Sequence, residues 1–163
     1  MPTNPFEPPE SEATRKREPA EPRSPFGAVM LGLLVDVGGS VAVGIAASVV
    51  YARQLHDDGV PDDQLREAMS NLPHDSALYM GTLLVGIALS VLGGYVCARV
   101  ARRHEYRAGL MMAAASALFS LVMGGGAEDA GMTALLTVTG FACNLLGVKW
   151  GADHNRRAEA ASP

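Results

Sequence analysis

Four long apolar runs, interrupted by a single charge, are the feature that most constrains what this chain can fold into. The runs cover residues 26–51, 76–98, 108–127 and 130–148, and their one charged residue is Asp36. A transmembrane helix needs roughly 20 mostly apolar residues to cross about 30 Å of hydrocarbon. A soluble helix would show a polar face at every turn, which these runs lack. The sequence therefore predicts an all-α fold, an integral membrane bundle of four transmembrane helices.

The polar segments around the runs set the predicted domain boundaries. We expect a transmembrane domain over residues 26–150, with helices at about 26–51, 76–100, 107–125 and 131–150. Residues 1–25 hold seven of the ten prolines and five glutamates. Such a segment cannot bury enough apolar surface to offset its ordering entropy. We therefore expect a disordered cytoplasmic tail at residues 1–25, and a second cytoplasmic tail at residues 151–163.

The first loop is long enough to carry structure of its own. Its segment PDDQLREAMSNLP, residues 61–73, begins with proline and two aspartates, as helix starts often do. Apolar or small side chains then recur on one helical face, at Leu65, Ala68, Met69 and Leu72. The pattern predicts a short amphipathic helix that lies against the outward ends of the bundle.

The distribution of basic residues predicts how the chain is oriented. Eleven of the thirteen Lys and Arg residues lie in the two tails and the second loop when these are taken up to the ends of the apolar runs, at residues 1–25, 99–107 and 149–163. By the positive-inside rule these segments face the cytoplasm. We expect a multi-pass protein of the bacterial cytoplasmic (inner) membrane with both termini cytoplasmic. The second loop contributes four arginines that we expect at the lipid headgroups: Arg99, Arg102, Arg103 and Arg107.

Small and polar residues recur at four-residue spacing inside the runs. The first run has Gly32, Asp36, Ser40, Gly44 and Ser48, and the second has Thr82, Gly86, Ser90, Gly94 and Ala98. Helices in a bilayer associate by close backbone approach and by interhelical hydrogen bonds, which such stripes permit. We expect these faces to line the bundle interior. Because four short helices make a thin bundle, we also expect a homo-oligomer or a larger membrane partner.

Asp36 is the main functional lead because it lies near the bilayer midplane, about 15 Å from the cytoplasmic end of its helix at 1.5 Å per residue. Counting depth along the other runs gives a candidate intramembrane polar cluster of Asp36, Ser40, Ser90, Ser116, Thr139 and Asn144. An ionised carboxylate at this depth would cost about 3 kcal/mol on insertion scales. The carboxyl therefore needs partners from the other helices.

Three interpretations of Asp36 remain open from the sequence. In the first, Asp36 stays protonated and its hydrogen bond locks the first helix to the bundle. In the second, the carboxyl exchanges a proton or a cation during transport. In the third, it makes a contact between subunits. The first favours a structural or accessory membrane protein, and the second a small proton- or cation-coupled transporter.

Two short stretches carry a resemblance to a family. GLLVDVGGS lies in the first run, and GGYVCARVARRHEYRAG joins the second and third. With these stretches the chain resembles a group of small four-helix bacterial membrane proteins. The matching positions are Asp36, Gly93, Gly94, Tyr95, Arg99, Arg102, Arg103, Glu105 and Gly109. The resemblance implies the four-helix fold and no particular function.

Other function classes find no support in the sequence. It has no Gly-rich phosphate loop, no histidine pair at metal-ligand spacing and no Ser-His-Asp set on one side of the membrane. We therefore expect no enzyme activity, no cofactor and no metal site. The expected surroundings are the lipid bilayer and a membrane partner, with no nucleic acid.

Overall fold

The structure is a computed structural model that describes most of the chain. The described residues are 25–61, 64, 67, 76–102, 104–124 and 130–161. The predicted tail at residues 1–25 lies outside this part of the chain, except for Pro25. Most of the predicted amphipathic helix at 61–73 also lies outside it, as does Arg103.

Four long helices make up the described part of the chain. The first is continuous from Pro25 to Asp57 and has three sections: α1 (Pro25–Leu33), the π-helical turn η2 (Leu34–Gly38) and α2 (Gly39–Asp57). The others are α4 (Ala77–Ala101), α5 (Glu105–Gly124) and α6 (Ala130–Ala160). All four are long and apolar enough to cross a membrane. The predicted all-α architecture of four apolar helices is confirmed, and it suggests a membrane protein.

Local sequence explains where α4 begins and ends. Ser76 precedes the helix, and its side chain accepts a hydrogen bond of 3.1 Å from the backbone N–H of Tyr79. This is an N-cap, which satisfies a donor that the first turn leaves free. At the other end Arg102 has a φ of 51°, a conformation that ends the helix. The short connection to α5 follows at once, as expected from the basic second loop.

Two helices continue beyond their predicted ends. The first reaches Asp57 instead of residue 51, and α6 reaches Ala160 instead of residue 150. The predicted tail at 151–163 is therefore helical up to Ala160. Packing explains the difference in α6, because Gly151, Ala152 and Asn155 are all buried. The composition of this segment is polar, but one face of its helix packs inside the bundle.

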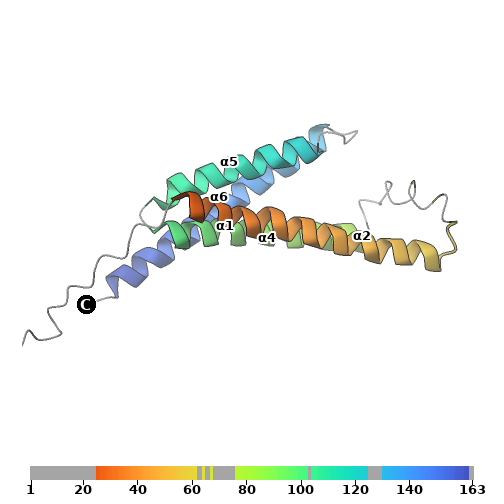
Figure 1. Ribbon diagram of the computed structural model, residues 1–163, viewed down its shortest axis with the longest axis horizontal. Coiled ribbons are helices and arrows are strands. Elements are labelled where there is room, and N and C mark those ends of the chain that lie inside the picture. The colour runs from red at the N-terminus through yellow and green to blue at the C-terminus, as the bar shows by residue number, and fades with distance from the viewer. Residues whose placement is uncertain are drawn as a thin grey trace, which may run out of the picture.

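The helices form a V whose two arms share one end. α4 contacts all the other helical elements. α1 and α2 run along α4 in one arm, and α5 and α6 form the other arm, as Figure 1 shows. The arms meet where α1 packs against α4 and α5, and they diverge toward α2. We call the shared end the closed end and the diverging end the open end.

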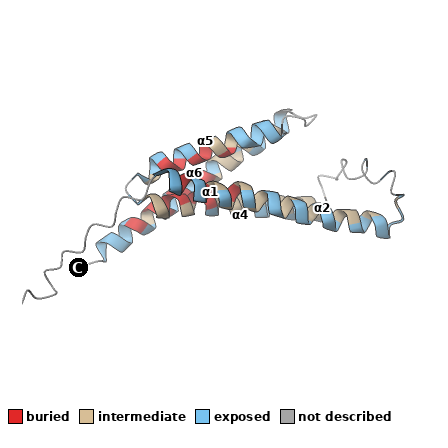
Figure 2. Ribbon diagram, in the orientation of Figure 1, coloured by how far each residue is buried: buried red, intermediate tan, exposed pale blue. Residues whose placement is uncertain are grey.

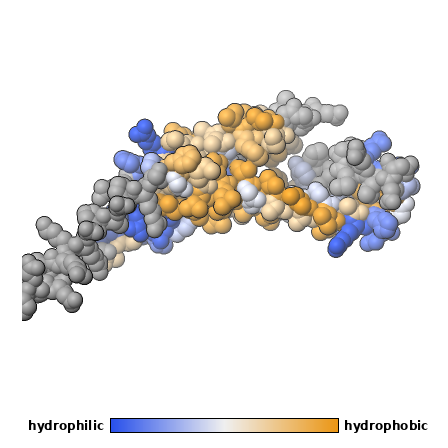
Figure 3. Space-filling view, in the orientation of Figure 1, coloured by the Kyte–Doolittle hydropathy of each residue, from blue (hydrophilic) through white to orange (hydrophobic). Residues whose placement is uncertain are grey.

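Burial is concentrated at the closed end. The core there joins Ala28 and Val29 of α1, Cys97 of α4, and Ala108 and Met112 of α5. In contrast, α2 contains no buried residue, and Figure 2 shows the buried positions gathered where the arms meet. Figure 3 shows hydrophobic residues over the middle of the molecule and hydrophilic residues toward its two ends. A band of this kind suits a bilayer.

Glycines bring α4 and α6 into backbone contact at the closed end. A Cβ added at Gly147 would collide with the carbonyl oxygen of Val91, and one added at Gly94 would collide with that of Asn144. One added at Gly151 would lie 2.7 Å from the carbonyl oxygen of Tyr95. This close approach is the packing expected of small residues at four-residue spacing in membrane helices.

Candidate functional site

Asp36 lies on the π-helical turn η2, between α1 and α2. A π-helical turn holds one residue more than an α-helical turn, so the helical face after it is rotated by about 100°. Before the turn, Ala28, Val29 and Gly32 are buried, whereas after it α2 buries nothing. The turn therefore marks the place where the first helix leaves the core. π-helical turns of this kind are frequent at functional sites.

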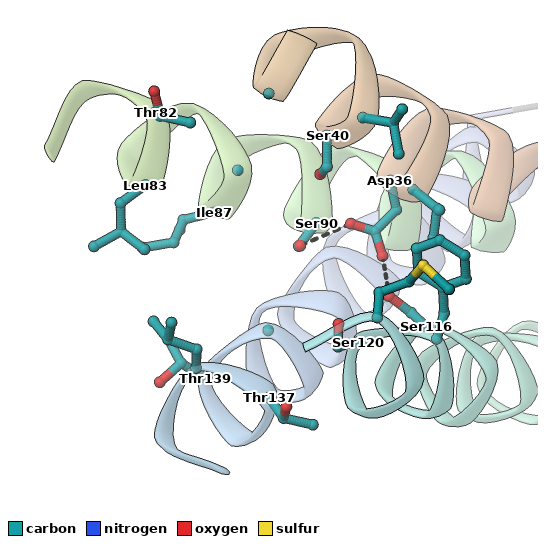
Figure 4. Close-up of a pocket in the computed structure, with 18 of the residues that line it drawn as sticks. Asp36, Ser40, Thr82, Leu83, Ile87, Ser90, Ser116, Ser120, Thr137 and Thr139 are labelled. Carbon is teal, nitrogen blue, oxygen red and sulfur yellow. Dashed lines mark hydrogen bonds between the residues drawn. The ribbon is translucent and has the colours of Figure 1, made fainter. Parts of the chain in front are cut away.

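The Asp36 carboxyl joins all four helices. It is only 3% exposed. Ser90 of α4 donates a hydrogen bond of 2.8 Å to Oδ1. Ser116 of α5 and Asn144 of α6 donate hydrogen bonds of 2.5 Å and 3.1 Å to Oδ2. Figure 4 shows the carboxyl between Ser90 and Ser116. We call these four residues the Asp36 cluster.

Glycine makes room for the carboxyl against α4. A Cβ added at Gly93 would lie 2.9 Å from the Asp36 Cβ, and one added at Gly32 would lie 3.0 Å from the Gly93 carbonyl oxygen. The two helices can therefore approach closely beside Asp36, which lets its short side chain reach α5 and α6. Larger side chains at these positions would hold α1 away from α4.

The hydrogen bonds surround the Asp36 carboxyl with neutral dipoles. Two hydroxyls and one amide N–H₂ group point their donors at Asp36. Within the described ranges, the ion pair of Arg156 with Asp153 lies elsewhere on α6. No cationic side chain of the described chain thus balances the Asp36 carboxyl.

A cavity of about 750 Å³ leads from the open end to the cluster. It lies between the two arms, and Asp36, Ser90 and Ser116 form its inner end. Its walls carry the hydroxyls of Ser40, Ser48, Thr82, Ser120, Thr137 and Thr139. Among the described residues that line it, Asp36 is the one charged side chain. The carboxyl is therefore buried but adjacent to a space that water or a small ligand can enter.

The structure brings together most, but not all, of the predicted polar cluster. Ser90, Ser116 and Asn144, which are all predicted members of the cluster, donate hydrogen bonds to Asp36. Ser40 and Thr139 line the cavity instead, and Figure 4 shows Thr139 well away from the carboxyl. Depth counted along the sequence placed Thr139 level with Asp36. It placed Asn144 somewhat nearer the cytoplasm. The contact of Gly147 with Val91 sets the register of α6 and brings Asn144 level with Asp36 instead.

A second polar contact, which the sequence analysis missed, ties the helices at the closed end. Asn155 of α6 is 5% exposed. Its Nδ2 donates hydrogen bonds of 3.0 Å to the carbonyl oxygen of Ala98 and 3.1 Å to Oε1 of Glu105. Its Oδ1 accepts one of 3.1 Å from Arg99. Asn155 lies eleven residues after Asn144, which is three helical turns, so its spacing was the available signal.

Replacing Asn155 with leucine should loosen this end of the bundle. The change removes three hydrogen bonds, and the Ala98 carbonyl of α4 keeps only the 3.3 Å bond from the backbone N–H of Arg102. We expect a loss of about 1–3 kcal/mol in unfolding free energy, measured by denaturant titration in detergent micelles. Asp153→Ala is the control, because it removes only an exposed ion pair and should cost under about 0.5 kcal/mol. Equal losses in the two variants would contradict this role of Asn155.

The predicted headgroup arginines have different surroundings. Arg99 is partly buried and bonds to Asn155, so it also serves packing inside the bundle. Arg102 ends α4, and Arg107 is exposed on α5. The described residues contain no group of three or more His, Cys, Asp or Glu side chains that could hold a metal ion.

Comparisons with known proteins complete the description of the site. No protein-family model matches the chain, and no curated protein or solved structure matches it significantly.

Proposed function

We propose that this chain is a multi-pass protein of the bacterial inner membrane, with both termini cytoplasmic, that acts as a structural or accessory bundle. In this function it packs with a second copy of itself or with a larger membrane partner. Eleven of the thirteen basic residues in the two tails and the second loop support the orientation. On this orientation the closed end lies in the cytoplasmic half of the bilayer and the cavity opens outward.

The observation that carries the proposal is the convergence of three helices on the Asp36 carboxyl. Ser90, Ser116 and Asn144 all donate to it. Hydrogen bonds between helices stabilise membrane bundles by about 0.6–2 kcal/mol each. A carboxyl that satisfies three donors at one point is well placed to lock four helices into one arrangement. This role requires no substrate.

The open end supports association with a further helix. α2 buries no residue within the chain. Gly44, Gly86 and Gly140 line the cavity, and a Cβ added at any of them would have nothing within 4 Å. Glycines on helix faces permit close backbone approach. At the closed end, glycines bring helices of this chain into contact. At the open end, they leave room for a helix of another chain.

The cavity favours one alternative function, a small proton- or cation-coupled transporter that uses Asp36. Ionisable residues inside membrane bundles that face a water-accessible cavity are common on ion pathways. The hydroxyl-lined space that ends on Asp36 has this form. It is open on one side of the cluster, so transport would require a second arrangement of the arms.

Mass and flux measurements distinguish the two functions. Native mass spectrometry of nanodiscs cut directly from the membrane should give a mass above one 17.0 kDa chain if the protein packs with itself or a partner. Proton flux into liposomes, followed with an entrapped pH-sensitive dye, should be equal for wild type and Asp36→Asn. A single chain in the nanodiscs, together with a flux that Asp36→Asn abolishes and Asp153→Ala, outside the cavity, retains, would contradict the bundle and support the transporter.

A further inference from the structure

One polar atom of the Asp36 cluster lacks a partner. Asn144 is 1% exposed, and its Oδ1 is buried without a hydrogen bond. The Nδ2 of the same amide donates to Asp36 Oδ2 at 3.1 Å. An unpaired buried acceptor costs about 1–3 kcal/mol. The amide is thus satisfied at its nitrogen and unsatisfied at its oxygen.

A side-chain amide can exchange these two ends by turning through 180°. After the turn, Asn144 Oδ1 would face Asp36 Oδ2, and two acceptors would oppose each other. That arrangement is favourable only when the carboxyl carries a proton, which it can then donate to Oδ1. One orientation of Asn144 therefore suits the carboxylate, and the other suits the carboxylic acid.

The two serines can follow the same change. In this chain Ser48, Thr82 and Thr137 donate to the carbonyl oxygen four residues earlier, at 2.8–2.9 Å. The Ser90 and Ser116 hydroxyls can rotate to make the same bond to the carbonyl oxygen four residues earlier on their own helices. A hydroxyl that rotates in this way no longer donates to the protonated Asp36 carboxyl. The two hydroxyls can therefore adapt to either form of Asp36 by rotation alone.

A proton can reach the site from one side. Asp36 and both serines line the inner end of the cavity, while Asn144 lies behind them. The groups that surround Asp36 from α4, α5 and α6 are neutral: Ser90, Gly93, Ser116 and Asn144. Titratable groups around the site are the Cys97 thiol beside Gly32, the Cys143 thiol next to Asn144 in sequence, and the tyrosines Tyr51 and Tyr79 of the cavity lining.

We propose that Asp36 and Asn144 form a proton-binding site that is loaded from the cavity. A hydronium ion in the cavity gives up a proton and becomes water, and a new O–H bond forms at Asp36 Oδ2. The Asn144 amide turns, and its Oδ1 accepts the new O–H. Asn144 is a positioning residue that holds the proton on Asp36. This site goes beyond the role of a structural bundle. In the alternative function, a transporter, it identifies the proton as the bound ion. The test below measures protonation of Asp36 and not flux.

Infrared difference spectroscopy on the full chain in liposomes tests the site. The protein is labelled with asparagine carrying ¹³C at the side-chain carbonyl, and Asn4 and Asn71 are replaced by serine to leave two labelled residues. Acidification between about pH 10 and 4 should produce a protonated-carboxyl band that is absent in Asp36→Asn. At the same pH one labelled amide carbonyl band should move to lower frequency, because its oxygen gains a donor.

The variants assign the amide band and keep the test decisive. The moving band should disappear in Asn144→Leu. If that variant does not fold, Asn144→Gln keeps the amide and carries no label, so the band should disappear there too. Asn155 provides an internal reference, since its Oδ1 already has a partner. A carboxyl that does not titrate, or one that titrates while the Asn144 band stays fixed, would overturn the proposal.

Discussion

Gly147→Ala is expected to separate α4 from α6 and to destabilise the bundle severely. The added Cβ would collide with the carbonyl oxygen of Val91 and lie 2.9 Å from the backbone nitrogen of Tyr95. Backbone atoms cannot rotate away as a side chain can, so the helices must move apart. We expect a loss of about 3 kcal/mol or more in unfolding free energy, measured by denaturant titration in micelles.

Gly140→Ala is the matched control, seven residues earlier on the same helix. A Cβ at Gly140 would meet nothing within 4 Å. Because alanine is the better helix former, stability should stay the same or rise by up to about 1 kcal/mol. Similar losses in both variants would show that an added methyl group lowers stability anywhere on this helix, and would contradict the close contact between α4 and α6 as the cause.

Asp36→Leu should release three donors at once. The Ser90 and Ser116 hydroxyls and the Asn144 amide would lose their common acceptor. Insertion of the first helix should become easier, since leucine suits the bilayer, but its association with the other helices should weaken. We expect the unfolding free energy in micelles to fall by roughly 2–6 kcal/mol, which is the sum of three interhelical hydrogen bonds.

Ser40→Ala is the control for Asp36→Leu, because Ser40 lies one turn away on the same helix and lines the cavity. Its removal should leave stability within about 0.5 kcal/mol of wild type. Asp36→Asn should give an intermediate loss, since an amide can still accept from a serine. A stable Asp36→Leu variant would show that the hydrogen bonds do not hold the helices together.

The sequence predicted the helices better than their arrangement. Apolar run length is a local property, so four membrane-length helices could be read directly. Register along α6 is set by tertiary contacts such as Gly147 with Val91, so of the two α6 residues predicted for the cluster Asn144 contacts Asp36, whereas Thr139 lines the cavity. The extension of α6 depends on packing of residues 151–155 that composition alone classes as polar.

The small-residue stripes show the same limit. The stripes of the first two helices were expected to line the interior along their whole length. At the closed end this is correct, since Gly32 and Gly94 meet neighbouring helices. At the open end Gly44 and Gly86 face the cavity with nothing within 4 Å of an added Cβ. A repeat of small residues permits close approach, but it cannot specify which partner approaches.

The claim that the Asp36 carboxyl binds the helices together is tested most directly by a double-mutant cycle between Asp36 and Ser116. Unfolding free energies are measured in micelles for wild type, Asp36→Leu, Ser116→Ala and the double variant. If the 2.5 Å hydrogen bond joins the first helix to α5, the double variant should lose less than the sum of the single losses, by about 1 kcal/mol or more. Strictly additive losses would contradict the account.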